Sequence, residues 1–220
     1  MVRRFASPFV LLLFVATIGA RSAGTRVLVF PGAEAPGLHL IEPAPGAQVP
    51  DRPWTMEELL PAMADLESGR NWMQGGRVFE QAGCGICHAM STYWGGNGLA
   101  PDLTAVASKM TRDAILQSIL EPSAALNGQY YHTEFTLKDG TVVRGTVVDA
   151  EGNALIVAPV MMVPDVTIRI AKADIASEAP SPVSPMPAGL LNPFSRGQIL
   201  DLLAFLDAGG NPDAAVYQRR

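Results

Sequence analysis

The chain has 220 residues, of which 48% are apolar and 17% are charged, and its formal net charge is -5. This length and apolar content suffice for one domain of ordinary size or two small ones, and they exclude a chain that is disordered throughout. A negative net charge without a block of Lys or Arg argues against nucleic acid as a partner, because phosphate binding requires concentrated positive charge. The 21 glycines and 18 prolines indicate that loops and extended segments take up much of the chain.

The first 20 residues have the pattern of a secretory signal peptide. Arg3 and Arg4 precede the apolar run 9–20, which is short for a membrane span and ends in small residues. We therefore expect cleavage after Ala20 and a periplasmic or otherwise exported protein, soluble after cleavage; retention of residues 1–20 as an anchor is the alternative. No later run reaches the ~18 apolar residues of a spanning helix, so no membrane span is expected in the mature chain.

Residues 21–53 contain six prolines and no regular hydrophobic period, which predicts an extended tether. We expect order to begin at Trp54, because Thr55 and Glu58 have the spacing of a capping box at the start of a helix. Pro61 should interrupt or restart that helix, since its ring is not accommodated in a helix interior.

Three further helices are expected before the C-terminus. One covers residues 71–81, and another follows Thr111 and ends before Pro122. The last covers residues 196–208, and the glycine pair 209–210 marks its end. The first and the last of these three helices should pack together.

Between these helices the hydrophobic period changes to two, which predicts an antiparallel sheet. Asp139-Gly140 predicts a hairpin turn, and His132 falls on the polar side of the first strand. After the sheet, four prolines between positions 180 and 187 predict an extended path without ladder hydrogen bonds, with Met186 inside it. The strands expected in this four-stranded antiparallel β-meander are 131–137, 141–148, 154–158 and 166–170.

Both cysteines of the chain lie in the segment Cys84-Gly85-Ile86-Cys87-His88. This is the spacing by which a c-type haem is attached: the two thiols form thioethers to the porphyrin, and the adjacent histidine becomes an axial ligand of the iron. A structural disulfide, a thiol redox pair and a zinc site are the alternatives. The disulfide leaves His88 unexplained, no βαβ pattern surrounds the cysteines, and the zinc site lacks further ligands, so one covalently attached haem c is the favoured cofactor.

Two further residues are expected to complete the site. The ring nitrogen of His88 that does not bind iron needs an acceptor, and the carbonyl of Pro101 is the expected one, although Pro101 also suits a simple turn. The second axial ligand is expected from Met186, because a proline-flanked loop just before the last helix can hold one thioether over the haem. A lone methionine more often fills a core. The other candidates for this ligand are His132, Met63, Met73, Met90, Met110, Met161 and Met162.

Several short segments, in their order along the chain, resemble a cytochrome-c-like haem-binding domain family that is often fused to sugar-dehydrogenase-like β-propeller modules in exported proteins. The resemblance covers about 150 residues, from Trp54 to Leu206. It implies that Cys84 and Cys87 attach haem and that His88 and Met186 are its axial ligands. The matching segments are Gly76 to Phe79, CGICH, Pro101 to Thr104, Ser118 to Ser123, Leu137 to Gly140, Asp174-Ile175 and Ser184 to Pro187.

The sequence thus predicts a mainly α fold: a c-type cytochrome helical domain over residues 54–210, with the meander inserted at about 130–176 and a C-terminal tail over 211–220. The expected function is that of a monohaem cytochrome, an electron carrier more than an enzyme, between exported redox partner proteins, with a dehydrogenase as one candidate donor. A haem peroxidase or a gas-ligand sensor with an open or labile distal site is the alternative. A third class is an interaction module in which the meander binds a partner.

Overall fold

The structure is a computed structural model, and it describes residues 50, 52–91, 94–96, 98–126, 129–160, 163 and 165–218. The expected signal peptide and nearly all of the expected tether lie outside the described residues, as do Met161 and Met162. Within the described part of the chain, no helix is long and apolar enough to cross a membrane.

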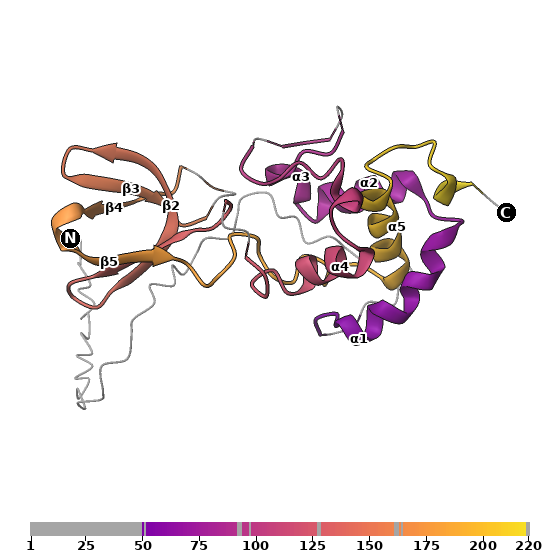
Figure 1. Cartoon of the computed structure of the whole chain (residues 1–220), viewed down its shortest axis with the longest axis horizontal. Coiled ribbons are helices and arrows are strands. Elements are labelled where there is room, and N and C mark those ends of the chain that lie inside the picture. The colour runs from indigo at the N-terminus through magenta and orange to yellow at the C-terminus, as the bar shows by residue number, and fades with distance from the viewer. Residues whose placement is uncertain are drawn as a thin grey trace, which may run out of the picture.

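The described chain forms a helical lobe and a sheet lobe, which lie side by side in Figure 1. Each lobe has its own hydrophobic core. The segment that leads from the sheet back to the helices crosses between the lobes, and it carries Met186. The helical lobe contains α1 (Met56–Leu59), η1 (Leu60–Glu67), α2 (Trp72–Gln81), α3 (Cys84–Cys87), η2 (Val106–Ser108), α4 (Arg112–Leu120), α5 (Arg196–Asp207) and η4 (Ala215–Tyr217).

The helices begin where the sequence predicts. Thr55 and Glu58 form the expected capping box, and the α-helix then changes to a 3₁₀ helix that has Pro61 near its start. Ser195 forms a second capping box at the start of α5, and Gly209 and Gly210 follow its end with φ angles of 60° and 73°. These left-handed conformations stop the helix at little steric cost only because both residues are glycines.

Helices α2 and α5 pack closely, as predicted, and the contact is made at Gly75. A Cβ atom on Gly75 would lie 2.7 Å from the Cβ of Phe205, too close for two carbon atoms. The rings of Phe79 and Phe205 lie 5.7 Å apart between their centroids. At the start of α2, the backbone N–H of Asn71 donates to Asp201 Oδ1 at 3.0 Å, which fixes where the two helices cross.

Gly75→Ala should lower the free energy of unfolding by about 1–3 kcal/mol, because the added methyl group forces α2 away from α5. Gly197→Ala is the matched control, since a Cβ at that helical position meets nothing within 4 Å. This second change should raise the free energy of unfolding by up to about 1 kcal/mol through helix propensity. Chemical denaturation of both variants measures the difference, and equal midpoints would contradict the close contact at Gly75.

The sheet lobe contains β1 (Thr133–Leu137), β2 (Val142–Glu151), β3 (Ala154–Ala158), β4 (Ile168–Ala171), η3 (Lys172–Asp174) and β5 (Ile175–Pro180). All neighbouring strands are antiparallel, and their order is β4-β3-β2-β1-β5. The long strand β2 pairs with β1 through its first half and with β3 through its second half. The core of this lobe consists of Phe135, Val143, Val157 and Ile170.

The predicted mainly α fold with a four-stranded meander is wrong: the chain has a mixed fold, and its sheet has five strands. The first four strands are the predicted meander, and β5 returns to pair with β1. The β5 sequence has no hydrophobic alternation because it is an edge strand, and its proline, Pro180, is the last residue. The ladder continues past it, since the N–H of Ser181 donates to the carbonyl of His132 at 2.7 Å.

Candidate functional site

The two cysteines lie on one short helical turn, α3. Gly83 precedes this turn with a φ of 76°, and the N–H of His88 donates to the carbonyl of Cys84 at 2.8 Å to close it. Both thiols are free and partly buried. Burial raises the pKa of Cys84 to about 12 and also raises the pKa of Cys87. A thiol redox pair uses the opposite shift, toward thiolate, so the raised pKa values argue against that alternative.

His88 follows the turn with its ring held in one orientation. Its Nδ1 lies 2.8 Å from the carbonyl oxygen of Pro101, which is the hydrogen bond that the sequence predicts. A carbonyl only accepts, so Nδ1 carries the proton and the lone pair of Nε2 is left for another partner. Burial lowers the pKa of His88, and the hydrogen bond to Pro101 partly opposes this shift. The imidazole is therefore neutral at pH 7, the form that binds a metal.

The loop after Pro101 is fastened to the chain that follows the CGICH turn. The N–H of Leu103 donates to the carbonyl of Ala89 at 2.9 Å, and the N–H of Ser91 donates to Oγ1 of Thr104 at 2.6 Å. These two bonds run in opposite directions between the segments, and they fix the carbonyl of Pro101 relative to the histidine. The orientation of the imidazole is thus set by a backbone carbonyl, which one backbone bond and the hydroxyl of Thr104 hold in place.

Gly95 and Gly96, which were not among the predicted site residues, also contact the CGICH turn. The N–H of Gly96 donates to the carbonyl of Gly85 at 2.8 Å. A Cβ on Gly95, whose φ is 55°, would lie 2.6 Å from the Cα of Gly85, and one on Gly96 would lie 2.6 Å from the Cβ of Ala89. The consecutive glycines were the available signal, since paired glycines mark a positive φ or a close backbone approach.

Trp94 precedes this glycine pair and packs into the helical lobe. Its ring contacts Trp72 and Phe205 edge to face, with centroid distances of 5.9 and 5.2 Å. A Cβ on Gly76 would lie 2.5 Å from the Trp94 ring, so that glycine leaves room for the indole. Trp94 therefore secures the loop that covers the turn.

Met186 lies on the segment between β5 and α5, where two hydroxyl groups hold the backbone. Its N–H donates to Oγ of Ser184 at 3.1 Å, and the N–H of Ser184 donates to Oγ of Ser123 at 3.1 Å. The partly buried side chain packs against the helical core, as does Cys84. Among the other methionine candidates, Met63 and Met90 are buried in the core, whereas Met73 and Met110 are exposed.

His132 is buried, with only 8% of its surface exposed, so the prediction that it lies on a polar face is wrong. His132 precedes β1, which begins at Thr133, so the two-residue alternation of the strand does not set its exposure. The segment after β5 returns across it, as the bond from the N–H of Ser181 to the carbonyl of His132 shows. Burial lowers the pKa of His132. The histidine directly precedes β1 of the sheet lobe and lines a pocket that contains none of the CGICH residues.

The structure thus brings together four of the five predicted site residues, Cys84, Cys87, His88 and Pro101, around one turn. Within the described ranges, no group of three or more His, Cys, Asp or Glu side chains is arranged to hold a metal ion. Comparison with models of known protein families gave no match to this chain, and comparison with curated proteins gave none either.

Proposed function

We propose that the chain is a monohaem c-type cytochrome that transfers single electrons between exported redox partner proteins. One observation carries this proposal: a neutral histidine, with Nδ1 bonded to a backbone carbonyl and Nε2 left available, follows a turn with two free thiols. A metal-binding histidine needs its second nitrogen fixed in this way. Two free thiols on one turn suit two thioether bonds to a single haem edge.

The residues present fit haem c by the chemistry of their donors. When bound, the haem would supply the one-electron chemistry of its iron. Cys84 and Cys87 would hold it covalently, and His88 would provide a nitrogen ligand whose basicity is raised by the bond to Pro101. Met186 is proposed as the second axial ligand, because its backbone is fixed by Ser184 and its side chain packs on the helical core.

Histidine and methionine ligation favours electron transfer over catalysis at the iron. With both remaining iron ligands supplied by the protein, nothing would have to bind or leave for an electron to pass. Methionine also favours the ferrous state relative to a nitrogen or oxygen ligand and so raises the reduction potential. The proposed protein would therefore accept an electron from one exported partner, for which a dehydrogenase is one candidate, and pass it to another.

Mass spectrometry under denaturing conditions tests the covalent attachment. The full chain, expressed in a host with haem-attachment machinery, should carry the mass of one haem, because thioether bonds survive unfolding whereas axial ligands do not. The Cys84→Ala, Cys87→Ala double variant should lose that mass completely. Expression of the wild-type chain without the attachment machinery is the matched control. A wild-type chain without added mass, made with the machinery present, contradicts the proposal.

A further inference from the structure

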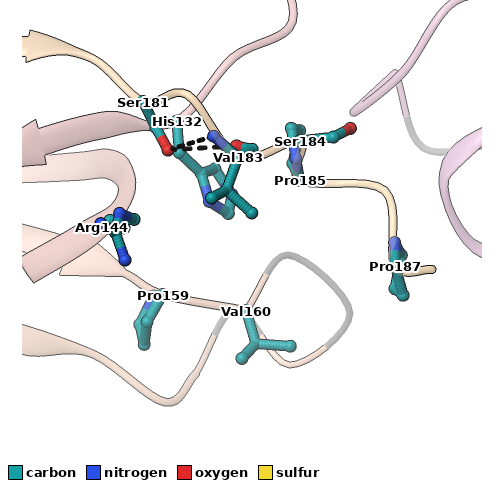
Figure 2. Close-up of a pocket in the computed structure, with 9 residues that line it drawn as sticks. All are labelled: His132, Arg144, Pro159, Val160, Ser181, Val183, Ser184, Pro185 and Pro187. Carbon is teal, nitrogen blue, oxygen red and sulfur yellow. Dashed lines mark hydrogen bonds between the residues drawn. The ribbon is translucent and has the colours of Figure 1, made fainter. Parts of the chain in front are cut away.

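A pocket lies where the sheet lobe meets the segment that carries Met186 (Figure 2). Its volume is about 260 Å³. The side chains of His132, Ser181 and Val183 form one wall, Pro159 and Val160 lie opposite, and Pro185 lies at one end. The site contains none of the residues of the CGICH turn.

The imidazole of His132 has one ring nitrogen, Nε2, without a hydrogen-bond partner in this pocket. Its Nε2 is one of two buried side-chain nitrogen or oxygen atoms in the described residues that have no hydrogen-bond partner. Buried polar atoms in folded proteins nearly always have a partner, because an unpaired one loses its hydration without compensation. The ring points from its wall toward the space above Pro159 and Val160 in Figure 2. A ligand that supplies the missing hydrogen bond therefore gains affinity at this atom.

The other polar groups of the pocket are already engaged. Nε of Arg144 donates to Glu134 at 2.6 Å, so the carboxylate neutralises the guanidinium charge. The hydroxyl of Ser181 donates to the carbonyl of Val183 at 3.1 Å and accepts from the N–H of the same residue at 3.0 Å. Oγ of Ser184, which also lines the pocket, accepts from the N–H of Met186 at 3.1 Å, and the rest of the lining is proline and valine. The pocket therefore favours a neutral ligand with an apolar body and one polar atom over an anion.

The volume of the pocket restricts the size of this ligand, and the unpaired Nε2 of His132 restricts its chemical class. A dry cavity of roughly 150 Å³ is enough to hold benzene, so about 260 Å³ accommodates one substituted six-membered ring. A hydroxyl group suits either tautomer of a neutral imidazole, because it can donate to a ring nitrogen or accept from a ring N–H. The guanidinium of Arg144 can in addition lie against the face of an aromatic ring.

We propose that this pocket binds a neutral, single-ring phenol, whose hydroxyl group forms a hydrogen bond with Nε2 of His132 and whose ring lies among the prolines and valines of the lining. The bound ring would contact Pro185 and Pro187, which flank Met186. If Met186 is an axial ligand, as the proposed function states, the phenol also stabilises the position of that ligand. Binding itself requires no haem.

Titration of the full chain with phenol, toluene and benzoate tests this proposal by calorimetry. Phenol and toluene have nearly the same shape, so their difference isolates the hydroxyl group, and benzoate reports on charge. Phenol should bind about five- to ten-fold more tightly than toluene, the factor expected for one hydrogen bond. Benzoate should bind more weakly than phenol. Absence of phenol binding, or equal affinity for phenol and toluene, overturns the proposal.

Two variants locate the binding. His132→Phe keeps a ring but removes the nitrogen, and it should reduce phenol affinity to that of toluene. Val160→Trp fills the pocket from a residue that is 41% exposed, and it should abolish binding of both compounds without disturbing the core. Val148→Trp is the matched control, because Val148 is similarly exposed but does not line the pocket. Phenol binding that survives in Val160→Trp, or that is lost in Val148→Trp, places the ligand elsewhere and overturns the proposal.

The proposed effect of phenol on the position of Met186 is measured separately, by absorption spectroscopy. In the haem-loaded chain, phenol should sharpen or shift the sulfur-to-iron absorption band in the far red, whereas toluene should do so only at higher concentration. Phenol binding without any change in that band overturns the link but not the binding. A chain made with the attachment machinery that carries no haem yet binds phenol contradicts the proposed function and leaves the pocket assignment intact.

Discussion

Replacement of Met186 by alanine should open the iron of the proposed cytochrome to external ligands. The oxidised wild-type protein should show a far-red sulfur-to-iron band, and this band should disappear in the variant because its sulfur donor is gone. The reduction potential should fall, since the thioether stabilises the ferrous state. The reduced variant should bind carbon monoxide rapidly, and the oxidised variant should turn over peroxide weakly. Absorption spectra, a redox titration and carbon monoxide binding measure these changes.

Met73→Ala is the matched control for this experiment. Met73 lies on α2 with 58% of its surface exposed, so its removal should leave the band, the potential and carbon monoxide binding unchanged. A wild-type protein that already binds carbon monoxide rapidly and turns over peroxide contradicts electron transfer as the main function. A peroxidase or a gas-ligand sensor then becomes the better proposal.

The helix starts could be predicted from the sequence because capping is a local interaction. Thr55 and Ser195 each bond to a residue three positions later, so the pattern and the structure that it forms lie in the same few residues. The hydrogen bond between His88 and Pro101 spans a longer loop. It was still predictable, because the chemistry of a ligating histidine demands an acceptor and the proline segment lies close by in the sequence.

The fifth strand and the burial of His132 could not be read from the sequence. The strand β5 pairs with β1, about 40 residues earlier in the chain, and only this pairing makes it a strand. Its exposed edge position needs no apolar face, so the hydrophobic period gives no signal. His132 is buried because the segment after β5 returns across it, which is a consequence of that same unpredicted pairing.

The loop that contains Gly95 and Gly96 packs on the CGICH turn, so changes in this glycine loop should affect haem attachment. Gly95→Ala should displace the loop or the turn, because its Cβ would lie 2.6 Å from the Cα of Gly85, inside the turn itself. Backbone atoms on both sides of the contact leave no flexible side chain to move aside. The added atom should reduce the fraction of chains that carry haem several-fold and lower the free energy of unfolding by about 1–3 kcal/mol beyond the cost of the backbone conformation.

Gly98→Ala is the matched control, because it introduces the same kind of backbone strain without the steric contact. Gly98 has a φ of 80° and Gly95 a φ of 55°, so alanine is unfavourable at both positions for the same conformational reason. A Cβ on Gly98, however, meets nothing within 4 Å. Gly98→Ala should therefore lose about 1 kcal/mol of stability but keep nearly full haem attachment, as measured by denaturing mass spectrometry and chemical unfolding. Equal attachment in the two variants would show that the geometry of the turn does not depend on the glycine loop, and His88 would then owe its orientation to Pro101 alone.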